Sequence, residues 1–136
     1  MNYMERKRMF DNICNFYSRN IWIHVGDCGA DDRAFSYVIR REIVLPGSAF
    51  RNPSEWDILA LLHEIGHIKT NTQKMKVYEK EYYATQWAAN EAKRIGFYVS
   101  PEWKKAYQEY IFEKRQNCIN RKGKNVVDKN KLIIKW

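Results

Sequence analysis

A long apolar run occupies residues 58–68, and its only polar side chains are His63, Glu64 and His67. The residues just before it, Ser54 to Asp57, have the Ser-x-x-Asp form of a helix capping box. Such a box begins a helix, because its side chains bind backbone N–H groups that the first turn leaves unpaired. A helix that is apolar on nearly all sides is buried. The chain is therefore expected to fold around one central helix that carries three polar side chains into the interior.

The rest of the sequence predicts a small sheet and more helices. Apolar side chains at helical spacing, with Gly and Pro at the boundaries, predict three further helices, at residues 2–18, 77–95 and 101–118. Short β-branched and aromatic runs are typical of strands, and they lie at 21–25, 35–39 and 42–45. The last two runs are spaced as a hairpin. We expect an α+β fold, in which a small N-terminal antiparallel or mixed sheet packs on the central helix, with three further helices around it.

The length of 136 residues fits a single domain, which we place at residues 1–119, followed by a basic tail or hairpin at 120–136. Most of the net charge of +8 lies at this end. Residues 114–136 carry eight basic side chains against one acid, Asp128, whereas residues 1–113 carry sixteen against fifteen. No sequence-reading motif accompanies the basic tail, so we expect from it only weak, salt-dependent, non-specific contact with nucleic acid.

Composition also bears on the compartment. No run approaches the 18 or so apolar residues of a membrane-spanning helix, and the charged residues 1–8 have no apolar segment behind them. The three cysteines, Cys14, Cys28 and Cys118, are odd in number and share no C-x-x-C spacing. This pattern argues against a disulfide framework and against a cysteine metal site. We expect a cytoplasmic protein without a membrane segment.

The central helix carries the motif HExxH at residues 63–67. His63 and His67 are four residues apart, so they project from one helical face and can bind the same tetrahedral zinc ion. Glu64 lies about 100° further round the helix, where it can act on a zinc-bound water without binding the metal. Gly66 weakens a helix by about 1 kcal/mol relative to alanine. Either close approach of a strand or substrate, or tight helix packing, would explain this glycine.

A catalytic zinc needs a third protein ligand. One face of the helix at 77–95 is a stripe of small and apolar side chains with a single charge, and its members are Val77, Glu81, Ala84, Ala88, Ala92 and Ile95. Because a buried carboxylate requires a cationic partner, Glu81 is the favoured third ligand. The alternatives are His24, Glu79 and the aspartates of the loop at 27–32. Glu79 shares the polar face of the same helix.

The segment 81–88, Glu-Tyr-Tyr-Ala-Thr-Gln-Trp-Ala, resembles the second motif of the small, stand-alone ImmA/IrrE metallopeptidases of phages and mobile elements, which are gluzincins. In that family the segment commonly reads Glu-x-Glu-Ala-Asn/Asp-x-Phe-Ala, with its first glutamate as a zinc ligand. The resemblance covers residues 35–96 and implies a minimal zincin-like domain in which Glu81 binds zinc. Two positions differ, Tyr83 and Thr85. The second difference leaves open which group orients a ligand histidine.

These observations predict a zinc-dependent endopeptidase with one zinc ion per chain, held by His63, His67 and Glu81. Glu64 would be the general base that activates water. The resemblance implies a protein substrate, such as a transcriptional repressor. The substrate would lie extended along the edge of the sheet, beside 35–39 or 42–45.

Two other functions fit the sequence. One is a catalytically weak zincin-fold protein that binds and modulates a host or mobile-element protein. The other is a nucleic-acid-binding protein that acts through its basic tail. The residue that would stabilise the oxyanion is also left open by the sequence, and the candidates are Tyr37, Tyr82, Tyr83 and Tyr98.

Overall fold

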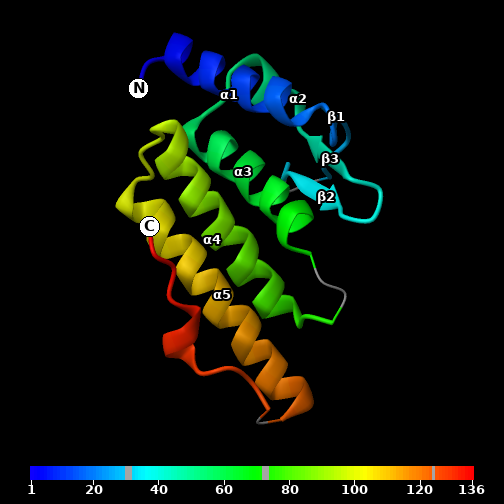
Figure 1. The fold of residues 1–136 in the computed structure, drawn as a ribbon, viewed down its shortest axis with the longest axis vertical. Helices are drawn as coiled ribbons and strands as arrows, with labels where there is room; N and C mark the ends of the chain where they lie inside the picture. The colour runs from blue at the N-terminus through cyan, green and yellow to red at the C-terminus, as the bar shows by residue number, and fades with distance from the viewer. Residues whose placement is uncertain (30–31, 72–73, 124) are drawn as a thin grey trace.

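The protein has an α+β fold in a computed structural model that describes residues 1–29, 32–71, 74–123 and 125–136 (Figure 1). In these residues the helices are α1 (Tyr3–Tyr17), α2 (Gly47–Arg51), α3 (Glu55–Thr70), α4 (Val77–Ile95), α5 (Pro101–Lys122) and the 3₁₀-helix η1 (Lys129–Leu132). The strands are β1 (Trp22–Val25), β2 (Phe35–Tyr37) and β3 (Glu42–Leu45). Within this described part, no helix combines the length and the apolar character needed to cross a membrane.

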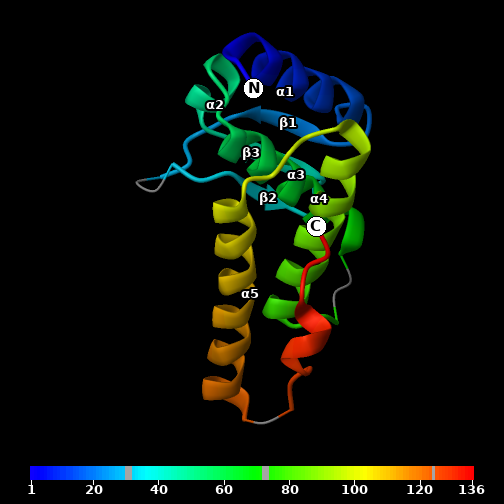
Figure 2. The same ribbon diagram turned by 90° about the vertical axis from the view of Figure 1, so that its left-hand side faces the viewer.

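The sheet is mixed and has the strand order β1-β3-β2. β1 runs parallel to β3, whereas β2 and β3 form the predicted antiparallel hairpin, with Phe35 opposite Val44. All four residues of β3 are buried, because the sheet lies between α1 on one face and α3 on the other (Figure 2). The α+β class and the small mixed sheet packed on the central helix are therefore confirmed.

Helix α3 is the buried centre of the molecule, as its apolar run predicts. Ile58, Leu61 and Ile65 have no exposed surface. The predicted capping box is formed, since the backbone N–H of Asp57 donates to Ser54 Oγ at 3.1 Å and that of Ser54 donates to Asp57 Oδ2 at 2.8 Å. The cap and the buried face together fix where the helix begins and how it is rotated, and this rotation sets the direction of the HExxH side chains.

One short helix, the end of a strand and the end of a helix differ most from the sequence-based expectation. The one-turn helix α2 was not predicted, because Pro46 and Gly47 indicate a turn, although proline is also favoured where a helix begins. Strand β2 ends at Tyr37 rather than at residue 39. Helix α5 continues beyond residue 118 to Lys122 and ends at Gly123, whose φ of 85° suits glycine.

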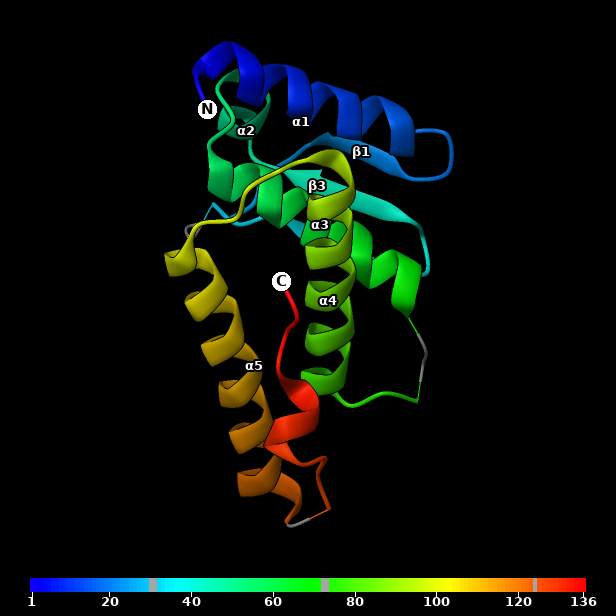
Figure 3. The ribbon, with the colours of Figure 1, turned by 60° about the vertical axis from the view of Figure 1, so that its left-hand side comes forward.

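The C-terminal segment 125–136 lies along α4 and α5 (Figure 3). It contains η1 and no strand, so a hairpin is not formed within these described residues. Leu132 and Ile134 are buried in an apolar cluster with Tyr78 and Ile111. The Gln108 side chain donates to the Leu132 carbonyl oxygen and accepts from the Ile134 backbone N–H, at 2.9 and 2.8 Å. The basic segment is thus attached to the helices by apolar contacts and backbone hydrogen bonds.

This packing predicts a large difference between two neighbouring substitutions. Leu132 is 2% exposed, so Leu132→Ala is expected to lower the free energy of unfolding by about 2–4 kcal/mol. Ile133 is 46% exposed, so Ile133→Ala is expected to change it by less than about 0.5 kcal/mol. Urea unfolding of the two variants and the wild type measures both values. Equal, small effects would mean that the segment is not packed in solution.

Candidate metal centre

Helices α3 and α4 approach each other closely at Gly66. A Cβ atom placed on Gly66 would lie 2.4 Å from the carbonyl oxygen of Ala84 and 3.0 Å from its Cα. Any side chain at this position would therefore force the two helices apart. Of the two explanations for the glycine, the structure supports tight helix packing. The contact brings the HExxH face of α3 against the small-residue stripe of α4.

Three side chains from these two helices converge on one point. His63 Nε2 lies 2.9 Å and His67 Nε2 3.3 Å from the same oxygen of Glu81, Oε2. The two imidazole rings are 4.6 Å apart and nearly perpendicular. All three side chains are largely buried, with exposed fractions of 9%, 14% and 14%. The structure thus brings together the three residues that the sequence singles out as candidate ligands.

Two of the three separations between these atoms are close to those around a small tetrahedral ion. Donor atoms that each lie about 2.0–2.1 Å from one zinc ion are separated by about 3.3 Å from one another. The two distances to Glu81 Oε2 are within a few tenths of an ångström of this value. All three donor atoms also lie within 4.8 Å of one another. Two imidazole nitrogens and one carboxylate oxygen are a donor set that suits zinc.

Three of the other residues considered as the third ligand have hydrogen-bond partners elsewhere. His24 Nε2 lies 2.8 Å from Glu42 Oε2, and Glu79 Oε1 accepts a hydrogen bond from the backbone N–H of Lys76 at the start of α4. Asp27 accepts one from the backbone N–H of Gly29. Asp31 lies outside the described residues, and Asp32, like the others, is absent from the only three-ligand group found in the described part of the chain.

The charges at the centre favour an ionised Glu81. Burial alone would raise the pKa of Glu81, but hydrogen bonds and charge interactions with His63 and His67 hold that pKa well below its usual range. Burial also opposes protonation of His67, yet the hydrogen bond to Glu81 raises the pKa of this histidine. A carboxylate that stays ionised is the form that binds a metal ion.

Glu64 lies beside the cluster and outside it. Its side chain is buried, and its Oε1 accepts a hydrogen bond from Ser36 Oγ of β2 at 3.0 Å. Burial raises the pKa of Glu64, and the neighbouring His63 and His67, with the Ser36 hydrogen bond, only partly offset this effect. A buried carboxyl with a raised pKa is suited to accept and release a proton.

Thr85 lies against the imidazole ring of His63, one of the candidate ligands. Its Oγ1 lies 3.1 Å from His63 Nδ1, and the residue is 1% exposed. In the tautomer that leaves Nε2 free to bind a metal, Nδ1–H donates this hydrogen bond. The Thr85 hydroxyl can therefore fix the tautomer and the orientation of the His63 ring.

We expect Thr85→Val to lower zinc affinity by about 10–100-fold, because valine keeps the shape of the side chain but leaves His63 Nδ1–H without a partner. Thr85→Ser keeps the hydroxyl and is the matched control, with an expected change of less than about threefold. Competition with a chromophoric zinc chelator measures both affinities. An equal loss in the two variants would mean that packing of the threonine methyl group, not its hydroxyl, supports the site.

A cleft of about 340 Å³ opens onto His63, Glu64, His67 and Glu81. Helix α5 supplies two tyrosines to its wall, Tyr107 and Tyr110, and the Tyr107 ring lies 5.1 Å from that of His63. None of the tyrosines considered from sequence lines this cleft. Tyr107 and Tyr110 belong to no recognisable sequence motif. They line the cleft because the turn between α4 and α5 directs their face of α5 toward the centre.

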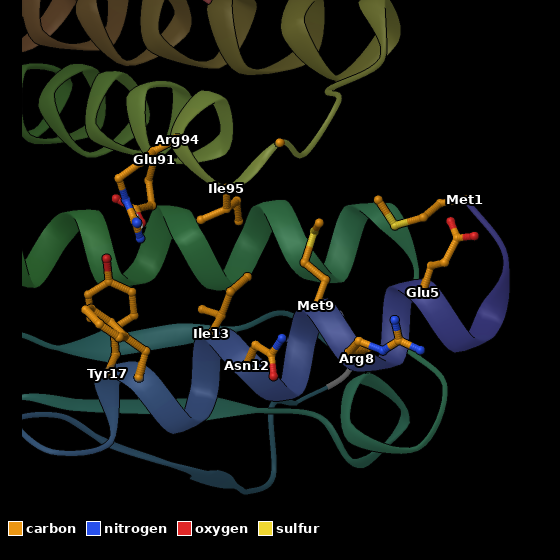
Figure 4. A pocket seen from close by; sticks show the side chains of 12 residues that line it. Met1, Glu5, Arg8, Met9, Asn12, Ile13, Tyr17, Glu91, Arg94 and Ile95 are labelled. Atoms are coloured by element: carbon orange, nitrogen blue, oxygen red, sulfur yellow. Dashed lines mark hydrogen bonds and ion pairs between the residues drawn. The ribbon is translucent and has the colours of Figure 1, made fainter.

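A second hollow lies away from this centre, between α1 and the C-terminal end of α4 (Figure 4). Its volume is about 530 Å³, and its lining includes Met9, Ile13 and Ile95 together with the ion pair of Glu91 and Arg94. Neither histidine nor cysteine lines it. This second hollow therefore has no histidine or cysteine that could bind a metal ion.

Comparisons of the chain with models of known protein families, with curated proteins and with solved structures each found no match. The class of protein is thus defined by the fold and the site themselves. It is a small α+β protein whose central helix and its neighbour bring two histidines and a glutamate together beside a buried carboxyl.

Proposed function

We propose that this protein is a cytoplasmic zinc-dependent endopeptidase of the ImmA/IrrE type. The observation that carries the proposal is the convergence of His63, His67 and Glu81 on one point, with Glu64 buried next to it. A metal site with a purely structural role has no use for a carboxyl group in that place. The assignment to this family rests on the HExxH motif and on the segment 81–88.

The roles of the residues follow from their positions. His63, His67 and Glu81 would hold the zinc ion, which would supply the Lewis acidity that polarises a peptide carbonyl and lowers the pKa of water. Glu64 accepts the proton from the attacking water and passes it to the leaving amine. Ser36 holds the Glu64 carboxylate at 3.0 Å, so that the base is oriented before the substrate binds.

The sheet offers one edge near this site for an extended substrate. β3 is paired on both sides, whereas β2 is an edge strand in the described part of the chain and carries Ser36, the partner of Glu64. A peptide that adds to the free edge of β2 would pass alongside the catalytic carboxyl. Of the two segments considered from sequence, the strand at residues 35–37 is therefore the one we propose as the docking edge.

The test has two parts. Protein purified without a chelating tag is expected to contain about one zinc ion per chain by elemental analysis. Wild type and Glu64→Gln are then expressed in the native host, and their proteomes are compared for fragments that only the wild type produces. A cleaved repressor would support the repressor substrate, and a folded, metal-free protein would contradict the proposal. Identical proteomes with retained partner binding would favour the binding function instead.

A further inference from the structure

The wall of the cleft beyond the four polar residues is built from two helices that face each other. On α3, Trp56 and Ala60 precede Glu64 at intervals of four residues, so all three lie on one face. On α5, Ala106 and Tyr110 are likewise four residues apart. The two pairs line the same cleft. Each helix therefore contributes one small and one aromatic residue next to the centre.

Aromatic rings extend from the centre toward the start of α5. The Tyr107 ring lies 5.1 Å from His63 and 5.4 Å from Trp56, and Trp56 lies 4.7 Å from Trp103. Trp56 is 37% exposed, although it packs against two other rings. One face of the Trp56 ring packs on other rings and the other face is exposed. Covering the exposed face with an apolar group lowers the free energy.

The two alanines leave room for such a group. The cleft has a volume of about 340 Å³, and Ala60 and Ala106 have only a methyl group to place in it. Apart from the polar residues at the centre, the only charged residue among those lining the cleft is Arg33. Away from Arg33, the wall is formed by alanines and aromatic side chains, which suit a hydrocarbon side chain better than a charged one.

We propose that the cleft between α3 and α5 is the subsite that binds a large apolar side chain, aromatic in preference, of the substrate residue flanking the cleaved bond. This inference rests on the proposed function, because the zinc centre fixes where the cleaved bond lies. The subsite would make the enzyme selective for bonds next to residues such as Phe or Leu, while the edge of β2 binds the backbone.

The test uses two zinc-binding probes, the hydroxamic acids of phenylalanine and of glycine, and measures their affinities by calorimetry with the zinc-loaded protein. The phenylalanine probe is expected to bind about 10–100-fold more tightly, because only its ring enters the cleft. Ala106→Leu places a larger side chain in the cleft and should bring the ratio close to one. Ala106 is exposed, so this variant is expected to fold.

Lys105→Leu is the matched control, since its side chain is 77% exposed and does not line the cleft. It should keep the wild-type ratio. Zinc-dependent binding of both probes with equal affinity would overturn the subsite and leave the metal centre intact, as would an unchanged ratio in Ala106→Leu. Absence of zinc-dependent binding of either probe would overturn the proposed function together with the subsite.

Discussion

Glu81→Ala is expected to lower the affinity of the protein for zinc by about two orders of magnitude or more, because one of three ligands is removed. The Oε2 atom of Glu81 is the point on which the Nε2 atoms of His63 and His67 converge, at 2.9 and 3.3 Å. Competition against a chromophoric chelator measures the change directly. The variant is expected to stay folded, since the lost carboxylate leaves no unpaired charge among the alanines of α4.

Glu79→Ala is the matched control for this experiment. Glu79 lies two residues earlier on the same helix, and its side chain accepts a hydrogen bond from the backbone of Lys76 at the helix start. The substitution should weaken the cap by about 1 kcal/mol and leave zinc affinity unchanged. If Glu79→Ala removed the zinc and Glu81→Ala retained it, the rotation of α4 described above would be wrong.

Glu64→Gln is expected to abolish most of the hydrolytic activity while the protein keeps its zinc. General acid–base catalysis contributes about 10²–10⁴-fold to a rate, and the amide can neither accept the proton from water nor deliver it to the amine. kcat should fall by this factor, while KM for a cleaved peptide changes little. The free energy of unfolding in the presence of a chelator is expected not to fall, because a buried charge is replaced by a neutral group of the same shape.

Ser36→Ala separates the role of Glu64 from that of its partner. It removes the hydrogen bond to Glu64 Oε1 but keeps the carboxyl, so an intermediate loss of kcat is expected. Loss of zinc from Glu64→Gln would show that Glu64 binds the metal, and full activity of this variant would show that the base is another group. Either result would contradict the assigned role.

The sequence predicts those parts of the site that local periodicity determines. The apolar run and capping box of α3 place His63 and His67 on one face, and the alanine stripe of α4 turns Glu81 inward. The β2–β3 hairpin is predicted for the same reason, because its strands are close in sequence. In each case a pattern within about twenty residues carries the information.

The remaining contacts depend on how distant segments pack, and no local pattern contains them. Ser36 reaches Glu64 across 28 residues, and Tyr107 lies against His63 because α4 and the turn after it position α5. The C-terminal segment shows the same limitation. Its charge indicates a solvated tail, yet two apolar residues, Leu132 and Ile134, decide that it packs on the helices.

The contact at Gly66 also bears on which ions the centre accepts. His67 follows this glycine directly, and Glu81 lies about one turn from Ala84, so the close approach of the two backbones limits how the three candidate ligands can be spaced. Side chains can adjust their rotamers, but two backbones in contact cannot move closer, and the buried α3–α4 packing resists their separation. The spacing of the donor atoms can therefore change little to suit ions of different radius. We expect the centre to favour a small four-coordinate cation over a large one such as calcium, which requires six to eight oxygen ligands at longer distances.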